Sequence, residues 1–277
     1  MLYRKDRHLF LHLRTDIQRA TAGSLYELDM NAKIRDMKED NPLVSVVTAT
    51  LNCEDVVERT IASVISQDYG NIEYIIIDGG STDATTSIVN KYSNSVAYAI
   101  SEKDFGIYDA MNKGICLASP ESGLITFLNA GDVFHDQSVI SNIVKIAERT
   151  EAHVYGNIIK GGQLLRTPDK ISEFTLATNM VCHQAIFFKT DVHRQYLYDA
   201  RFTLCADYKL LIDLVRAGEP FCKGDLLVVD FDESGLSSQN RQEVTKEKRK
   251  IRRVYPKVWA YHWCKNIYRF MGPTKLV

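Results

Sequence analysis

The chain has 277 residues, 45% of them hydrophobic and 25% charged, which is enough to bury a large core in one or two domains. Its formal net charge is only −1, but residues 241–277 hold eleven Lys or Arg against two Glu. No apolar run approaches the ~20 residues of a membrane-spanning helix, and charges interrupt the N-terminus too often for a signal peptide. These features exclude an integral membrane protein and predict a soluble protein, or at most a peripheral one.

From residue 43 onward, predicted strands and helices alternate. Apolar and β-branched runs predict strands over residues 43–50, 72–78, 95–101, 123–129 and 152–158, and helical spacing of apolar residues predicts helices over 55–67, 83–92, 107–118 and 136–148. Near-continuous apolar strands separated by helices indicate an α/β fold with a mostly parallel central sheet covered on both faces. The second half is less regular, with strands expected over 184–189 and 225–232 and a helix over 207–217.

The two ends of the chain differ from this core. Residues 1–41 form an irregular, charged N-terminal extension that we expect to be helical in part. Residues 241–277 form a basic, aromatic helical tail that Pro256 divides into two pieces. Six cysteines, at positions 53, 116, 182, 205, 222 and 264, show no metal-binding spacing, and we interpret them as reduced thiols, several of them in the core, of a cytoplasmic protein.

Polar residues follow the predicted strands at the point where each strand ends. They are Thr48, Thr50 and Asn52 after the first strand, Asp78, Gly79 and Ser81 after the second, Asp104 after the third, and Asn129 and Asp132 after the fourth. Each alone has an ordinary explanation as a turn or helix-capping residue. Because ligands of open parallel sheets bind outside the carboxyl ends of the strands, the group as a whole predicts a binding site.

The glycine patterns of dinucleotide-binding and P-loop sites are absent from the chain. An acidic edge without a phosphate-binding loop favours a divalent cation, Mn²⁺ or Mg²⁺, that is held by carboxylate and bridges the phosphates of a nucleotide.

Five separated motifs resemble family 2 of the glycosyltransferases. They are "PLVSVVTATLN", "IEYIIIDGGSTDATTSIV", "SEKDFGIYDAMNKGI", "ITFLNAGDVF" and "CHQAIFFK", and the resemblance as a whole covers about residues 43–230. The resemblance implies the GT-A fold, with residues 42–135 binding a nucleotide sugar and residues 136–240 holding the acceptor and the catalytic groups. It also implies inverting transfer of a sugar from a UDP, GDP or dTDP donor to a glycan acceptor. Within the family, the motifs look like those of bacterial enzymes that build surface polysaccharides.

The resemblance also implies a role for each residue that matches a motif. The implied nucleotide-sugar contacts are Thr48, Thr50, Asn52, Asp78, Gly79, Ser81, Asp104, Asn112, Lys113 and Asn129, with Gly79 standing where the family has a second acid. Asp132 is the acid that remains of the family's D-x-D metal motif. His183 is a further candidate for the metal or diphosphate, or else a hydrogen-bonded histidine beside a strand.

The expected catalytic base is Asp207, at the start of a late helix. Its alternative role is that of a first-turn carboxylate favoured by the helix dipole, and Asp213 is a second candidate base.

Two alternatives to this function stay open at the level of sequence. One is a catalytically inactive binding or scaffold subunit, because the metal motif is degenerate. The other is a nucleotidyltransferase of similar fold, although "TATLNCEDVVERT" lacks the glycine-rich basic loop that such an enzyme needs.

The tail suggests a further partner. Trp259 and Trp263 share a helix face, with basic residues elsewhere, as in a helix that lies on an anionic membrane and reaches a polyprenyl-diphosphate-linked acceptor. The alternative is that these tryptophans pack on the domain or on a second subunit. No nucleic acid is expected, because no recognised binding module accompanies the charge.

Overall fold

The computed structural model describes residues 41–232 and 240–271. The described residues from Leu43 onward belong to one compact unit. The predicted N-terminal extension lies outside the described residues, apart from Asn41.

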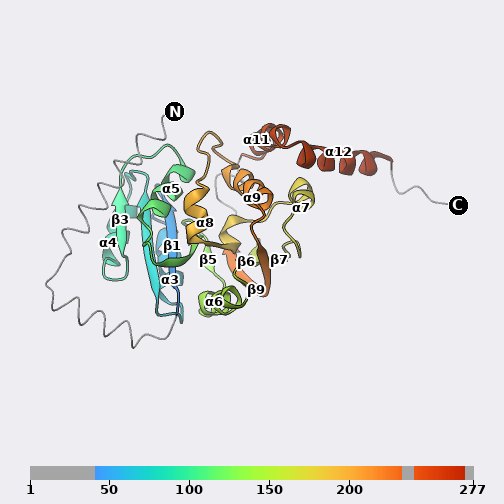
Figure 1. Cartoon of the computed structure of the whole chain (residues 1–277). Helices are drawn as coiled ribbons and strands as arrows, with labels where there is room; N and C mark the ends of the chain where they lie inside the picture. The colour runs from blue at the N-terminus through green and yellow to red at the C-terminus, as the bar shows by residue number, and fades with distance from the viewer. Residues whose placement is uncertain (1–40, 233–239, 272–277) are drawn as a thin grey trace. The chain divides into compact units, whose positions relative to one another are not determined.

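One sheet runs through this unit in the strand order β3-β2-β1-β4-β8-β6-β9-β5, with β7 paired to β6 (Figure 1). The strands are β1 (Leu43–Thr50), β2 (Ile72–Asp78), β3 (Tyr98–Ser101), β4 (Ser122–Phe127), β5 (Val133–Phe134), β6 (His153–Lys160), β7 (Gln163–Leu165), β8 (Ile186–Lys189) and β9 (Phe221–Phe231). The first four are mutually parallel, β8 runs antiparallel to β4 and β6, and β9 is parallel to β6. The mostly parallel sheet is therefore confirmed.

Helices cover both faces of the sheet (Figure 1). The core cluster on one face includes residues of α3 (Val57–Ile65), α4 (Thr85–Lys91) and α6 (Val139–Thr150), and the cluster on the other face includes residues of α5 (Ile107–Leu117), α7 (Glu173–Thr178), α8 (Thr190–Gln195) and α9 (Ala206–Ala217). Successive residues of a strand point to opposite faces, so Val46 packs into the first cluster and Val47 into the second. This alternation explains why seven of the eight residues of β1 are buried.

The predicted elements of the first half are present, with shifted ends. The third strand begins at Tyr98 rather than at residue 95, because Ser95 lies in a turn in which its N–H donates to the Tyr92 carbonyl. The helix expected from residue 136 begins at Val139, because Asp136 accepts hydrogen bonds from the backbone and hydroxyl of Ser138 and forms a turn before the helix. The sequence did not predict the short elements β5, β7, α7, η1 (His183–Ala185) and α8.

The prediction that several cysteines lie in the core as reduced thiols agrees in part with the structure. Cys205 is fully buried, whereas Cys53 and Cys182 pack at the edge of the core and stay partly exposed. No disulfide joins the cysteines of the described chain, and the side chain of Cys264 lies outside that description.

The tail forms two helices, α11 (Arg241–Val254) and α12 (Pro256–Met271). Pro256 occupies the first position of α12, where its missing N–H costs no hydrogen bond. Ile251, Tyr255 and Val258 pack into the core. No helix among the described residues is long and apolar enough to cross a membrane.

The tryptophans of α12 are half exposed. Trp259 and Trp263 are 47% and 54% exposed, and their rings stack on each other with centroids 6.4 Å apart. The described structure therefore leaves an exposed aromatic surface on this helix.

Two histidines, His153 at the start of β6 and His193 on α8, are fully buried. The ring of His193 sits between those of Phe127, Phe188 and Tyr198 at centroid distances of 4.7–5.2 Å. His153 packs against Phe188 and Phe221. Burial lowers the pKa of each histidine to about 4, so both are neutral in the folded protein near neutral pH.

These histidines predict a loss of stability in acid. Their pKa values are lower in the folded chain than the ordinary 6.5, so their contribution to stability is complete above that pH and is lost as the pH falls toward about 4. Each contributes on the order of 3 kcal/mol across this window. We expect urea denaturation at about pH 7.5 and about pH 5 to show a smaller difference for His193→Leu than for the wild type. An equal difference in both proteins would contradict this account.

Candidate active site

The carboxyl ends of β1, β2 and β3 meet at the carboxylate of Asp78. Its Oδ1 accepts hydrogen bonds from the hydroxyls of Thr50 (3.0 Å) and Ser81, and its Oδ2 accepts from the Ser101 hydroxyl (2.6 Å) and from the N–H groups of Ser81 (2.9 Å) and Gly80 (3.2 Å). Burial alone would raise the pKa of Asp78, but the hydrogen bonds from Ser101, Ser81 and Thr50 outweigh it and lower the pKa. Asp78 is therefore ionised and joins three strand ends.

The loops that follow β1 and β2 are also tied together. Asn52 has a left-handed backbone (φ 46°), its N–H donates to the Ser81 hydroxyl at 2.7 Å, and its side-chain oxygen accepts from the Thr82 N–H at 2.9 Å. The side chain of Asn52 thus lies on an exposed loop at the same edge as Asp78.

Gly79 lies directly beneath Asp104. A Cβ atom at position 79 would sit 2.5 Å from the Oδ2 atom of Asp104, too close for any real contact. The Oδ1 atom of Asp104 accepts from the Gly106 N–H at 2.9 Å, which holds the carboxylate at the N-terminal end of α5. Six of the predicted nucleotide contacts therefore share one edge of the sheet. They are Thr50, Asn52, Asp78, Gly79, Ser81 and Asp104.

The turn after β4 delivers Asp132. Gly131 has φ 103°, a conformation that favours glycine, and its N–H donates to the Thr60 hydroxyl, which in turn donates to the carbonyl of Asp132. The Asp132 carboxylate is buried, with Oδ2 accepting from the side-chain amide of Gln184 (2.9 Å) and Oδ1 from the N–H of Asp232 (2.8 Å). Burial raises the pKa of Asp132 to about 6, although both hydrogen bonds act to lower it.

A chain of hydrogen bonds joins this turn to the start of α9. Asn129 Nδ2 lies 3.1 Å from Nε2 of His183, and His183 Nδ1 lies 3.1 Å from Oδ2 of Asp207. Since a carboxylate only accepts and an amide nitrogen only donates, His183 carries its proton on Nδ1.

Asp207 is held firmly at the end of this chain. Its Oδ1 accepts from the Tyr108 hydroxyl (2.9 Å) and from the Tyr208 N–H (2.8 Å). Burial raises the pKa of Tyr108 well above its usual value, so the hydroxyl remains a donor. The structure thus brings the predicted base together with the candidate metal residues.

Several residues of this site escaped the sequence analysis. Gln184 and Tyr108 orient Asp132 and Asp207, but no motif marks them for that role. Asp232, at the end of β9, forms an ion pair with Arg59 of α3 and fills the space beside Gly131. Asp232 also follows the end of a strand, so the rule that such acids gather at one edge applies to it. The rule could not be used from the sequence, because the sequence does not show that β9 lies beside β6 and β5.

Other predicted residues lie away from the open edge. The Thr48 hydroxyl is buried and donates to the Leu128 carbonyl at 2.7 Å. Asn112 is buried on α5, where its side chain bonds both the N–H and the carbonyl of Tyr198 at 2.9 Å. Lys113 forms an ion pair with Glu102 at 2.7 Å. This geometry gives no support to the nucleotide contacts assigned to Thr48 and Asn112.

Asp213, the second candidate base, also lies apart from the Asn129–His183–Asp207 chain. Its carboxylate binds the ammonium of Lys209 at 2.7 Å and accepts from the Tyr255 hydroxyl at 2.6 Å. These contacts tie α9 to the tail and give Asp213 a structural role.

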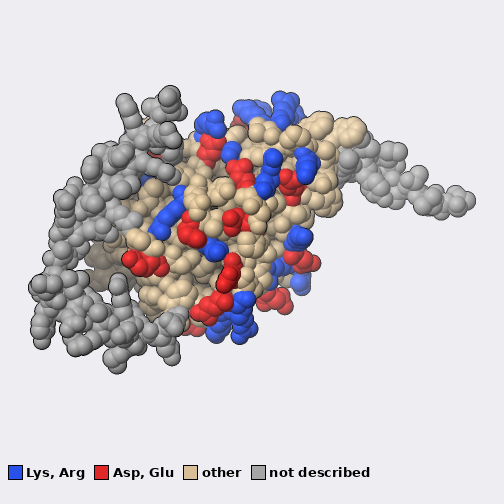
Figure 2. All heavy atoms as spheres, in the orientation of Figure 1, with Lys and Arg blue, Asp and Glu red and all other residues tan. Residues whose placement is uncertain are grey.

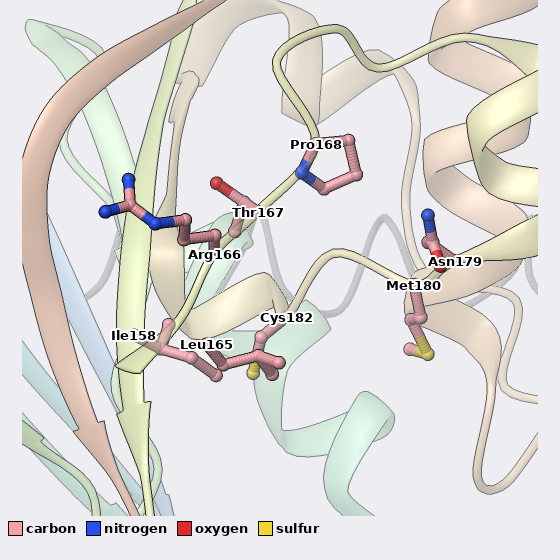
Figure 3. Close-up of a pocket in the computed structure, with 8 residues that line it drawn as sticks. All are labelled: Ile158, Leu165, Arg166, Thr167, Pro168, Asn179, Met180 and Cys182. Carbon is pink, nitrogen blue, oxygen red and sulfur yellow. The ribbon is translucent and has the colours of Figure 1, made fainter. Parts of the chain in front are cut away.

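A cavity of about 250 Å³ is lined by residues between Ile158 and Cys182 (Figure 3). It lies between β6, the segment after β7 and the segment that leads into η1, and Cys182 in its wall directly precedes His183. The apolar lining residues are Ile158, Leu165, Pro168 and Met180, and the others are Arg166, Thr167, Asn179 and Cys182.

The donor set around Asp132 suits a hard cation. No three His, Cys, Asp or Glu residues gather as a metal site within the described ranges. The Oδ1 atom of Asn129, however, is buried and accepts no hydrogen bond, and each Asp132 oxygen keeps one lone pair. Two oxygen ligands from the protein fit a cation that takes its remaining ligands from a diphosphate and water. His183 Nε2 is already occupied by Asn129.

Comparison with known proteins identifies the family. Residues 45–206 match the family described as "Glycosyl transferase family 2". An uncharacterized glycosyltransferase of Mycobacterium tuberculosis is 34% identical over 206 residues, which cover 71% of this chain and 78% of the relative. A PGL/p-HBAD biosynthesis glycosyltransferase of Mycobacterium bovis is 29% identical over 174 residues, covering 60% of this chain and 67% of the relative.

Solved structures share the fold. A fragment of TarS from S. aureus in complex with UDP has a TM-score of 0.61 at 14% identity, over 76% of this chain and 64% of that one. The chain spans 39% of a longer TarS structure. The mannosyltransferase PcManGT from Pyrobaculum calidifontis, in complex with GDP-Man and Mn²⁺, has a TM-score of 0.63 at 17% identity, over 80% of this chain and 70% of that one.

The fold is that of the GT-A glycosyltransferases. The chain belongs to glycosyltransferase family 2, and it is a sugar-transferring enzyme.

Asp78 provides a stability test of this edge. We expect Asp78→Ala to lower the free energy of unfolding by about 3 kcal/mol, because it leaves the buried Thr50 hydroxyl and four partly buried donors without their acceptor. Asp104→Ala, which removes one exposed backbone contact, serves as the matched control and is expected to cost about 1 kcal/mol or less. Urea denaturation at neutral pH measures both, and similar losses in the two variants would contradict the role given to Asp78.

Proposed function

We propose that this enzyme transfers a sugar, with inversion, from a nucleoside diphosphate sugar to a glycan acceptor in the synthesis of a bacterial surface polysaccharide. The observation that carries the proposal is the hydrogen-bonded chain from Asn129 through His183 to Asp207. It joins the place where the diphosphate is expected to the place where the acceptor is expected.

The donor side of the proposal rests on the edge around Asp78 and Asp132. Two TarS structures contain UDP and UDP-GlcNAc, respectively, and the PcManGT structure contains GDP-Man and Mn²⁺. In this chain, Asp132 and Asn129 Oδ1 would hold a divalent cation, Mn²⁺ or Mg²⁺. The bound cation would offset the negative charge that develops on the leaving diphosphate.

Asp207 is the proposed base. Three donors bind its carboxylate, and a lone pair remains at Oδ2 beside the contact with His183. The acceptor hydroxyl attacks the anomeric carbon from the face opposite the diphosphate and gives its proton to this oxygen as the bond to the diphosphate breaks. Tyr108 and His183 keep the carboxylate in place during the transfer.

The acceptor side of the proposal rests on the cavity of Figure 3. The cavity is lined by apolar side chains, on which a sugar ring can pack, and by the amide of Asn179. Cys182, another lining residue, directly precedes His183 in the chain. The relative named for PGL/p-HBAD biosynthesis supports a role in building a cell-surface glycan.

Two variants test the proposed chemistry. Asp207→Asn is expected to lower sugar transfer about 10²- to 10⁴-fold, because Asn cannot take the acceptor's proton, while leaving donor affinity nearly unchanged. Asp132→Ala is expected instead to remove the Mn²⁺ dependence of donor binding, which calorimetry with UDP and GDP sugars measures directly. Asp213→Asn, on the same helix as Asp207, is the control that should retain transfer.

The outcomes separate the parts of the proposal. Near wild-type transfer by Asp207→Asn would exclude it as the base. A wild-type chain that binds donors but never turns over, even with an extract containing native acceptors, would favour a binding subunit.

We also propose that the tail holds the enzyme at the cytoplasmic face of the membrane, where a polyprenyl-diphosphate-linked acceptor would lie. Basic side chains gather along the upper edge in Figure 2, over α11. The exposed pair Trp259 and Trp263 follows on α12. Anionic lipid attracts the basic side chains of α11, and the boundary between headgroups and acyl chains favours the tryptophans of α12.

Vesicle sedimentation tests this placement. We expect the wild type to bind vesicles that contain phosphatidylglycerol and to leave neutral vesicles unbound, with binding reduced at high salt. Trp259→Ala combined with Trp263→Ala should bind several-fold more weakly, because it removes the apolar anchor. Leu164→Ala changes an exposed apolar residue on β7 and serves as the control. Equal binding by the tryptophan variant and the control would contradict the placement.

A further inference from the structure

The helix that carries the proposed base has no side-chain cap of its own. A turn of residues 203–205 leads into α9, and Cys205, at the N-cap position, makes no capping hydrogen bond with its side chain. A thiol is a weak hydrogen-bonding group, so it is a poor substitute for the usual Ser, Thr, Asp or Asn. The backbone donors of this turn therefore need a partner from elsewhere in the chain.

Glu247 of the tail is that partner. It lies on α11, which is drawn beside α9 in Figure 1. Its Oε1 accepts from the N–H and the hydroxyl of Thr203, both at 3.0 Å, and its Oε2 accepts from the Leu204 N–H at 3.0 Å. The Cys205 thiol adds a weak contact, because it donates to the Val244 carbonyl at 3.6 Å. One carboxylate of the tail thus holds the turn through three donors.

A second contact joins α11 to the residue that follows the base. The N–H of Tyr208 donates to Oδ1 of Asp207. The buried ring of Tyr208 lies 5.6 Å from the guanidinium of Arg252 and 5.7 Å from the ammonium of Lys248. Arg252 Nε also donates to the Tyr208 hydroxyl at 3.1 Å. The helix α11 therefore contacts the chain on both sides of Asp207.

We propose that Glu247 is a positioning residue for the base, and that it acts through the turn of residues 203–205. Tyr108 and His183 orient the carboxylate of Asp207, but the turn from which α9 starts sets the place of its backbone. A displacement of about 1 Å at a reacting group can lower a rate about a hundredfold. The tail therefore serves the chemical step, in addition to the proposed attachment to the membrane.

This inference rests on the proposed role of Asp207, and hydrolysis of the donor tests it, because water can replace the acceptor hydroxyl. The full chain is assayed without lipid, in the presence of Mn²⁺, with UDP-GlcNAc, GDP-mannose and dTDP-glucose. We expect Glu247→Ala to lower kcat about tenfold to a hundredfold, while KM and the calorimetric affinity for the donor stay within about twofold of the wild type. Glu243→Ala is the matched control and should retain kcat, because Glu243 lies one turn earlier on α11 and pairs with Lys246 of the same helix.

Two further variants separate positioning from a general loss of structure. Asp207→Asn already removes the base, so adding Glu247→Ala to it should lower kcat no further, whereas a structural loss would be additive. Glu247→Gln keeps one of the two acceptor oxygens, so its kcat should lie between those of the wild type and Glu247→Ala.

Amide hydrogen exchange locates the change without any substrate. In Glu247→Ala we expect faster exchange at Thr203 and Leu204, which lose their acceptor, and at Tyr208, whose N–H bonds the base. Exchange in β1, residues 43–50, should match the wild type, which shows that the variant is folded.

Several outcomes would overturn the inference. They are an unchanged kcat in Glu247→Ala, an equal loss in Glu243→Ala, additive losses in the double variant, or unchanged exchange at Tyr208. Near wild-type hydrolysis by Asp207→Asn would instead show that the proposed base is wrong, which separates that failure from a failure of Glu247 alone. A wild type that hydrolyses none of the three donors would remove the proposed function together with the inference.

Discussion

The carboxylate of Asp78 is the contact on which the open edge of this enzyme depends. Three parallel strands end there, and a charged group with five donors around it fixes Thr50, Ser81 and Ser101 relative to one another. Parallel strands leave their last polar groups unpaired at the carboxyl end, and a buried anion satisfies several of them at once. The loops that carry Asn52 and Asp104 begin from this point, so their geometry follows from it.

Glycine has a second use at this edge, which is to leave room for acids from other segments. Asp104 lies over Gly79, and Asp232 fills the space beside Gly131. At Gly79 and at Gly131 the motif itself has no acid, and a carboxylate from a different loop lies beside the glycine. Asp232 also donates its N–H to Asp132, so this turn has a second carboxylate beside it that the motif "NAGD" does not indicate.

The sequence analysis predicted the α/β fold, the alternation of elements and the edge at which the polar residues gather, because apolar periodicity and strand ends are local properties. It did not predict which side chains face the ligand. Thr48 is one residue from Val47 and points to the opposite face of β1, into the core. Asn112 lies within a helix motif but serves the backbone of Tyr198, which is far away in the chain. Short elements such as β5 and η1 carry too few residues to show a period.

The sequence by itself determined the family, the order of the longer strands and helices, and the candidate acids Asp78, Asp104, Asp132 and Asp207. These depend on residue type and on spacing along the chain. Only the tertiary structure decided which of these acids is saturated, which keep a lone pair, and that His183 links Asn129 to Asp207. The reason is physical: the capacity of a carboxylate to bind a ligand depends on how many donors surround it, and most of those donors come from strands and loops that are distant in sequence.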